Sequence, residues 1–223
     1  MSKVLDNNIA EIESFLTKFR TSPPKLEGLF KTQYKQFHSL LIWGFCYETD
    51  INVSETEKLF FKETLSDLSH SLFLLLLNLY KPSRFSIRSS IENFVRAILI
   101  SRKIDVGSIS TVHGLFDEAN LVFKNHEEIK NRIGELRGIY SELCKSAHSV
   151  KIDYLSLTIP LNQITDFDQK AYTDISKVFL SVCRLINQIT FLIHHDIISL
   201  AGHRNSDALN DSIPNALKRK IAI

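Results

Sequence analysis

Apolar residues recur along most of this chain three or four positions apart, which is the period of an α-helix with one buried face. The pattern predicts helices over residues 8–19, 29–45, 54–80, 83–102, 111–123, 127–148 and 170–200. Ser54 and Glu57 have the spacing of a capping box, so we expect the third helix to begin there. We expect Pro82 to end this helix, because proline lacks the N–H group that a helix interior requires.

Two stretches depart from the helical pattern. Residues 151–166 alternate between apolar and polar positions and contain Pro160, which favours an extended loop or a short strand. The pattern over residues 205–223 predicts a short helix followed by a mobile C-terminal tail. No repeat and no Gly- or Ser-rich linker divides the chain. The sequence therefore predicts a single helical domain over 1–223, an all-α bundle of about six to eight helices.

Composition argues against several classes of protein. The chain has 27 basic and 25 acidic residues, and its net charge of +2 is well below that of domains dominated by phosphate contacts. The three cysteines, Cys46, Cys144 and Cys183, are far apart and odd in number, which favours a reducing, cytoplasmic location. The most apolar stretch, residues 72–80, is about half as long as a membrane span requires, so we expect no membrane insertion.

Charged side chains fall on the apolar face of the helix predicted over 83–102. Arg88 lies within the apolar arc, Glu92 lies at its edge, and Arg96 lies one step further round. Spacings of four residues let either arginine meet the carboxylate. One interpretation is a structural ion pair that joins this helix to its neighbour, because an unpaired buried charge is costly. The other is an arginine that faces an anion and is oriented by Glu92, since a guanidinium matches phosphate geometry.

The helix predicted over 127–148 carries a second group of chemically active side chains along one edge of its apolar arc. Tyr140, Cys144 and His148 follow one another at intervals of four residues. His148 is either an interior histidine with a partner or a group that transfers protons, since its ordinary pKa is about 6.5. Tyr140 is either a core aromatic or a hydrogen-bond donor. Cys144 is either a small buried thiol or a nucleophile beside His148.

The sequences of these two helices resemble a group of bacterial HEPN-like domains. The pattern of that group is R-S-x-x-E followed by Y-x-x-L-S-x-x-x-H. Residues 88–92 (R-S-S-I-E) match its first part, and residues 140–148 (Y-S-E-L-C-K-S-A-H) resemble its second part. Glu92 and Arg96 also resemble the E-x-x-x-K/R element of parts of the HEPN superfamily. The resemblance covers roughly residues 60–150. It implies a helical bundle, commonly dimeric, in a superfamily with many metal-independent ribonucleases of toxin–antitoxin, abortive-infection and CRISPR-linked defence systems.

The resemblance also implies roles for matching residues. Active members bring an arginine and a histidine together across a dimer through an R-x(4–6)-H motif. In this chain His148 takes the place of the histidine, and Glu92 with Arg96 takes that of the supporting helix. The chain departs from the pattern at two points, because Cys144 replaces the serine and no arginine stands four to six residues before His148. An arginine that works with His148 must therefore come from another helix.

Arg137 does not fill that position. It lies eleven residues before His148, which is about 16 Å along a straight helix and too far to share one phosphate. The resulting hypothesis is an endoribonuclease in which the histidine transfers a proton, an arginine holds the phosphate, Glu92 orients the guanidinium and Tyr140 donates a hydrogen bond. The candidate catalytic residues are His148, Arg96, Arg88, Glu92 and Tyr140.

The alternative hypothesis is a non-catalytic interaction or RNA-binding module, in which the same residues form a structural polar network. Expected partners are RNA and either a second copy of the chain or a defence-system protein. No cofactor and no metal ion are expected. His194, His195 and Asp196 are adjacent on a predicted helix, where neighbouring side chains point about 100° apart and cannot readily bind one ion.

Overall fold

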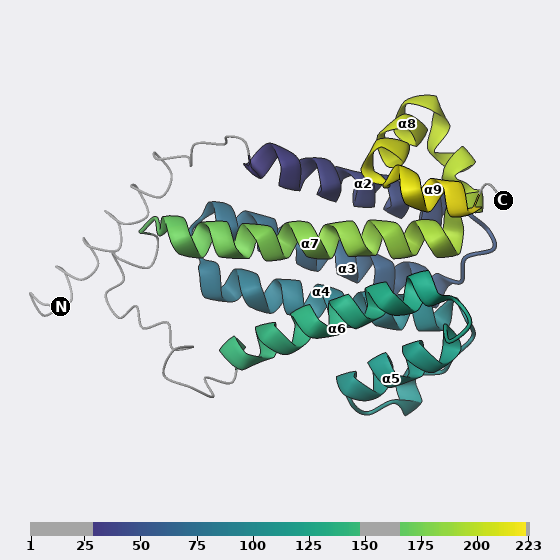
Figure 1. Cartoon of the computed structure of the whole chain (residues 1–223), viewed down its shortest axis with the longest axis horizontal. Coiled ribbons are helices and arrows are strands. Elements are labelled where there is room, and N and C mark those ends of the chain that lie inside the picture. The colour runs from purple at the N-terminus through teal and green to yellow at the C-terminus, as the bar shows by residue number, and fades with distance from the viewer. Residues whose placement is uncertain (1–28, 148–165, 222–223) are drawn as a thin grey trace, which may run out of the picture.

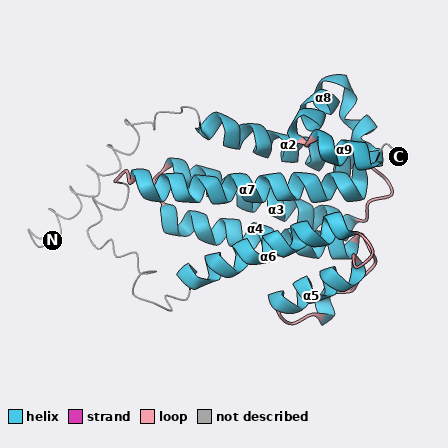
Figure 2. Cartoon of the chain, in the orientation of Figure 1, coloured by secondary structure: helices cyan, strands magenta, loops and turns pink. Residues whose placement is uncertain are grey.

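The computed structural model describes residues 29–147 and 166–221, which form an all-α bundle without strands in those two ranges (Figure 2). The helices are α2 (Leu29–Thr49), α3 (Glu55–Leu76), α4 (Tyr80–Ile100), α5 (Val112–Val122), α6 (Glu127–Ala147), α7 (Gln169–His194), α8 (Gly202–Ser212) and α9 (Asn215–Ile221). Short 3₁₀ segments occupy Val106–Ser108 and His195–Ala201. The predicted all-α class is confirmed. The helix predicted over 8–19 and the extended segment over 151–166 lie outside the described residues, apart from Asp166.

The longest helix, α7, runs through the middle of the bundle, with α2 on one side and α4 and α6 on the other (Figure 1). Its apolar positions recur at helical spacing and are buried, as the sequence predicts, including Ile175, Phe179, Val182 and Ile186. Removal of this apolar surface from water is the main force that holds the helices together. The side chain of Asn187 crosses from α7 to α2 and donates a hydrogen bond of 2.9 Å to a backbone carbonyl there.

The break between α3 and α4 lies earlier than the sequence predicts. Helix α3 ends at Leu76 rather than near Tyr80, and α4 already begins at Tyr80. The connection places Asn78 at a φ of 60°, a left-handed conformation that asparagine tolerates better than most residues. Pro82 lies in the first turn of α4. Backbone N–H groups in a first turn have no hydrogen-bond partner within the helix, so the missing N–H of proline costs nothing there. The prediction that Pro82 ends the preceding helix is therefore wrong, because the proline lies inside the start of the next one.

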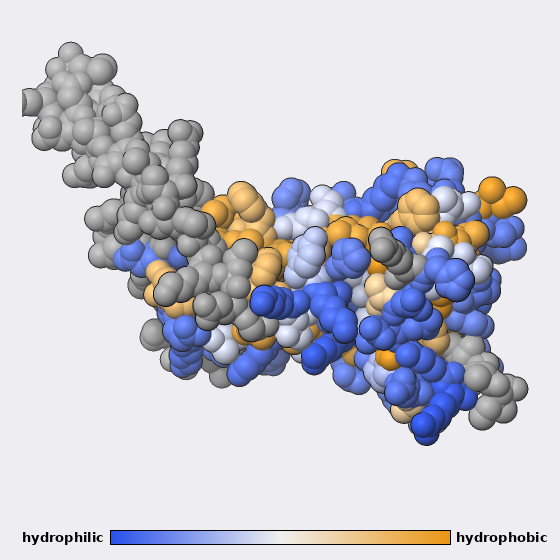
Figure 3. Space-filling model, turned by 90° about the horizontal axis from the view of Figure 1, so that it is seen from above, coloured by the Kyte–Doolittle hydropathy of each residue, from blue (hydrophilic) through white to orange (hydrophobic). Residues whose placement is uncertain are grey.

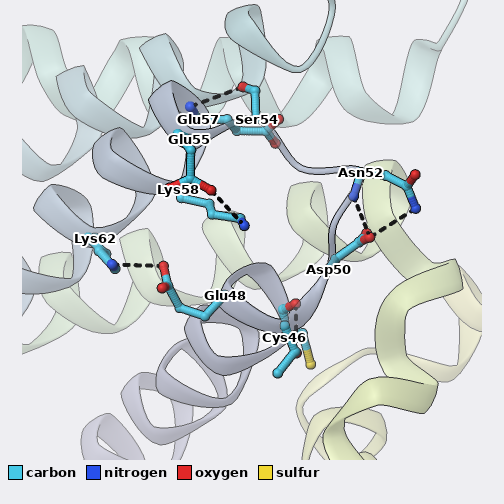
Figure 4. A network of polar contacts seen from close by, with 10 residues as sticks. Cys46, Glu48, Asp50, Asn52, Ser54, Glu55, Glu57, Lys58 and Lys62 are labelled. Carbon is cyan, nitrogen blue, oxygen red and sulfur yellow. Dashed lines mark hydrogen bonds and ion pairs between the residues drawn. The ribbon is translucent and has the colours of Figure 1, made fainter.

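Only one of the two hydrogen bonds of the predicted capping box forms at the start of α3. The backbone N–H of Glu57 donates to Ser54 Oγ over 3.3 Å, as a capping serine requires (Figure 4). The carboxylate of Glu57 does not complete a capping box, because its Oε1 lies 3.1 Å from Nε2 of His194 on α7. The ion pair between Glu48 Oε1 and Lys62 Nζ, 2.9 Å apart, joins the end of α2 to α3 across the short connection (Figure 4).

The C-terminal part of the described chain contains more helix than the sequence predicts. The predicted helix over 170–200 becomes α7 and a 3₁₀ segment, and two helices follow it within the predicted tail region. Apolar residues of these two helices join the core: Leu209, Ile213 at the end of α8, and Leu217 are 0%, 4% and 2% exposed. One helical stretch, Gln169–Ala201, is long and apolar enough to cross a membrane, but 67% of its most apolar window is buried inside the bundle. That burial is consistent with the core helix of a soluble protein.

Candidate functional site

Arg88 on α4 contacts Tyr140 on α6 directly. Its Nε–H donates to the Tyr140 hydroxyl over 3.3 Å, and its guanidinium carbon lies 5.5 Å from the centroid of the tyrosine ring. The two residues are 52 positions apart in sequence. Tyr140 is buried, with 3% of its surface exposed, whereas Arg88 is half-buried. The contact therefore fixes a partly accessible cation against a rigid aromatic side chain, through a hydrogen bond and a cation–π interaction.

The surroundings of this contact keep both groups protonated. Burial raises the pKa of the Tyr140 hydroxyl, although the hydrogen bond from Arg88 opposes that effect. A side-chain hydrogen bond with Cys144, one turn further along α6, raises the same pKa. The hydrogen bond with Tyr140 raises the pKa of Arg88, so the guanidinium stays charged. Phe116 of α5 packs against the tyrosine ring, with the two centroids 5.7 Å apart.

Only one nitrogen of the Arg88 guanidinium is used by the described part of the chain. Its Nη1 and Nη2 make no hydrogen bond and no ion pair with the described residues. These two nitrogens form the fork that matches two oxygens of a phosphate or carboxylate. Arg88 is thus a positioned cation whose anion-binding edge has no partner among the described residues.

Arg96 is held differently, although it lies on the same helix. Its Nη2 is 2.8 Å from Oε1 of Glu92, and its guanidinium carbon lies 6.0 Å from the centroid of Phe60 on α3. The Arg96 and Glu92 side chains are 23% and 24% exposed. The spacing of four residues predicts this pair, and the pair turns Arg96 toward α3, whereas Arg88 turns toward α6. Glu92 acts on Arg88 only as a nearby charge that contributes the smallest of the effects raising its pKa.

The structure therefore divides the predicted site residues into two pairs, Arg88 with Tyr140 and Glu92 with Arg96. His148, the fifth predicted residue, lies outside the described residues. Of the three predicted site residues on α4, Glu92 neutralises Arg96. Arg88 is therefore the cation whose terminal nitrogens have no partner among the described residues.

A groove with a volume of about 690 Å³ lies between α6 and α7, and no pattern in the sequence indicated it. Apolar side chains from both helices line its interior, namely Ile139, Leu143, Ile175, Val178 and Leu185. Charged residues of both signs stand around them, and none of the predicted site residues is among the lining residues. The volume is within the range of ligand pockets, about 300–1,000 Å³. Single-helix patterns cannot reveal such a groove, because it depends on how two helices diverge.

A second ionisable cluster that the sequence did not reveal joins α2, α3 and α7. We call it the buried junction, and it consists of Tyr47, Glu57 and His194. The carboxylate and imidazole are 3.1 Å apart, and their side chains are 5% and 14% exposed. The ring of Tyr47 lies 4.9 Å from that of His194, and burial followed by the charge of Glu57 raises the pKa of Tyr47 well above its ordinary value. A ligand has no access to these atoms, so the cluster serves to hold three helices together.

The described residues contain no group of three His, Cys, Asp or Glu side chains arranged to hold a metal ion. The adjacent histidines His194 and His195 have separate contacts. His194 pairs with Glu57, and the ring centroid of His195 lies 6.3 Å from that of Phe191. Comparison with models of protein families, with curated proteins and with solved structures finds no match to this chain.

Proposed function

We propose that this chain is a HEPN-like protein of a bacterial defence or toxin-type system, located in the cytoplasm, that binds RNA through Arg88 and cleaves it without a metal ion. The observation that carries the proposal is that the two terminal nitrogens of Arg88 have no partner within residues 29–147 and 166–221, while Tyr140 holds its Nε–H. A charged group with a fixed orientation loses little side-chain entropy when it binds a phosphate.

Arg88 is a better candidate than Arg96 for the phosphate-binding role. A phosphate that approaches Arg96 competes with the carboxylate of Glu92, which already lies 2.8 Å from one terminal nitrogen. A phosphate at Arg88 meets terminal nitrogens without a described partner, and the tyrosine contact can persist while it binds. The contact also joins the two helices that carry the HEPN-like motifs. It thereby supports a shared site for both motifs.

His148 is the proposed proton-transferring group. In cleavage of RNA without a metal ion, the 2′-oxygen attacks the phosphorus and the 5′-oxygen leaves with its bond to phosphorus broken. A base must accept the proton of the 2′-hydroxyl, and an acid must donate a proton to the leaving oxygen. His148 follows the described end of α6, eight residues after Tyr140, and acts as the base in this scheme. A second subunit supplies the acid, and Arg88 stabilises the charge that develops on the phosphate oxygens.

Incubation of the full-length protein with a fluorescent single-stranded RNA tests this function. We expect His148→Ala to reduce cleavage by about 100-fold or more while RNA binding changes little, because the histidine transfers protons and does not anchor the phosphate. We expect Arg88→Ala to weaken both binding and cleavage. Arg184→Ala is the matched control, because Arg184 is an exposed arginine of α7 without a described partner and should leave both unchanged. Full cleavage by His148→Ala contradicts the catalytic scheme.

A second candidate function, a non-catalytic interaction module, is favoured by an apolar stripe on α2. Tyr34, Leu41 and Phe45 are 47%, 39% and 51% exposed, and their spacings of seven and four residues place them on one side of the helix. The face of the bundle that carries α2, α8 and α9 shows apolar patches among polar side chains (Figure 3). The partner proposed for this stripe is a second copy of the chain, since heptad spacing suits helix pairing.

Light scattering coupled to size exclusion distinguishes the two candidates. A dimer that Phe45→Glu converts to a monomer, with no RNA cleavage by the unmodified protein, supports the interaction module. Lys35→Glu, at an exposed polar position of the same helix, is the control for the change in charge. RNA cleavage that depends on Arg88 and His148 favours the nuclease.

A further inference from the structure

We propose that Arg84 binds a second phosphate of the RNA and that the groove between α6 and α7 holds the base of the same nucleotide. This inference rests on the proposed function, because it extends the binding site from Arg88 into the groove. It assigns one phosphate contact and one base contact to residues outside the HEPN-like motifs.

Arg84 lies one helical turn before Arg88 on α4, and both residues are half-buried. Residues four apart on a helix share a face, with their Cβ atoms about 5–6 Å apart. Arg88 contacts Tyr140 of α6, and Arg84 is the only residue of α4 among the lining residues of the groove beside α6. Two cations so close together on one helix suit neighbouring phosphates of a single RNA strand, whose backbone follows positive charge along a groove.

Arg84 is also the charge best placed to select a ligand. Of the charged residues that line the groove, Arg84 alone is half-buried, and it has no hydrogen bond or ion pair with the described part of the chain. Charges of both signs at the rim are exposed, so water and salt screen them, and they favour neither sign of ligand. A half-buried guanidinium gains more from an anionic partner than an exposed one does. The exposed rim residues are Glu135, Glu142, Asp174 and Arg184.

The interior of the groove suits a planar base. Apolar side chains of α6 and α7 line it, and its volume of about 690 Å³ is large enough for a nucleotide. Its smallest lining residues come one from each helix, Gly138 from α6 and Ser181 from α7, and a Cβ atom added to Gly138 would meet nothing within 4 Å. The faces of a base are apolar and gain from leaving water. The rim carboxylates accept hydrogen bonds, which the amino and ring N–H groups of bases donate.

Fluorescence anisotropy with the full-length protein and a labelled single-stranded RNA tests the phosphate contact. We expect Arg84→Ala to lower the slope of log affinity against log salt by about 1, and the double variant with Arg88→Ala to lower it by about 2. Arg184→Ala is the matched control, because this arginine also lines the groove but is exposed, and the slope should stay unchanged. If Arg88→Ala lowers the slope and Arg84→Ala does not, this inference fails while the proposed function stands.

The same RNA synthesised with abasic nucleotides tests the base contact. We expect the unmodified protein to bind the abasic strand about tenfold more weakly, because the phosphates remain and the bases are lost. Gly138→Leu places a side chain in the groove and should weaken binding of the normal RNA about tenfold without affecting the abasic strand. Gly134→Leu is the control, because Gly134 is an exposed glycine of α6 with equally open space but does not line the groove.

Equal affinity of the unmodified protein for the two strands overturns the inference. This comparison needs no variant, so it decides the question even if a substitution disturbs the bundle, which circular dichroism detects. Equal effects of the two leucine variants also overturn the inference. An effect of Gly138→Leu that appears only where light scattering detects a dimer assigns the groove to a second copy and overturns it too. Absence of RNA binding by the unmodified protein overturns the proposed function together with this inference.

Discussion

The Arg88–Tyr140 contact and the buried junction of Tyr47, Glu57 and His194 use similar side chains for different purposes. Each joins helices that are far apart in sequence, and each places a tyrosine beside a charged or chargeable group. At the junction, the carboxylate and the imidazole face each other and are almost completely buried. At the other contact, the tyrosine is buried, but the arginine is half-exposed and its terminal nitrogens have no partner in the described part of the chain. Access to the unpaired group, rather than the presence of ionisable residues, is the reason that we propose a ligand site at Arg88 and not at the junction.

The largest effect on stability is expected at the junction. Glu57→Ala removes the buried partner of His194, and we expect the free energy of unfolding to fall by about 3 kcal/mol. Urea denaturation followed by circular dichroism measures the change. Glu63→Ala, at an exposed position of the same helix, should change it by less than about 0.5 kcal/mol. A loss for Glu57→Ala as small as that of the control contradicts the structural role of the junction.

Alkaline pH should weaken the region of the junction as well. Burial raises the pKa of Cys46, next to Tyr47, from 9.0 to about 11. The unfolded chain loses this proton above pH 9 while the folded chain keeps it, so stability is complete below pH 9 and declines as the pH rises toward 11. The decline from this group should reach up to about 2.5 kcal/mol. Urea titrations at several pH values measure it, and Cys46→Ala should reduce the slope if the thiol is responsible.

Arg88→Ala should have a smaller effect on stability and a larger effect on ligand binding. Loss of the hydrogen bond to Tyr140 should lower the free energy of unfolding by about 1.5 kcal/mol. RNA affinity should fall, and the slope of log affinity against log salt should decrease by about 1, as expected for one lost phosphate contact. Fluorescence anisotropy at several salt concentrations measures both quantities. An unchanged salt slope contradicts the assignment of Arg88 to a phosphate.

Arg96→Ala should have the smallest effect. The pair with Glu92 is partly exposed, so its loss should change the free energy of unfolding by less than about 1 kcal/mol. RNA binding should persist, because Arg96 is already neutralised by the carboxylate. If Arg96→Ala abolishes RNA binding and Arg88→Ala does not, the roles that we assign to the two arginines are reversed.

Local sequence patterns were sufficient for most of the helices and for the position of Arg88 on an apolar face. The start of α5, capped by Thr111, and the start of α6 fall where the periodicity predicts them. Local patterns failed at Pro82, because proline breaks a helix interior and also suits a first turn, and the chemistry of the residue alone does not distinguish the two.

Contacts between distant helices were beyond the reach of the sequence. The spacing of Ser54 and Glu57 predicts a capping box, but the carboxylate lies 3.1 Å from the imidazole of His194, 137 positions away in sequence. Arg88 could be expected to need a partner, and the choice of Tyr140 over Glu92 depends on the packing of α4 against α6. The groove between α6 and α7 likewise appears only when both helices are placed.

The hydrogen bond between Asn187 on α7 and the backbone of α2 closes a loop of 151 residues, and this has a consequence for synthesis on the ribosome. At about 5–20 residues per second, α7 emerges roughly 8 to 30 s after the segment of α2 that it covers. Throughout that delay Phe37 lacks Phe179 of α7, whose ring centroid lies 6.2 Å from its own in the folded chain, so the nascent chain exposes apolar surface. A chaperone that binds such surfaces has this interval in which to act.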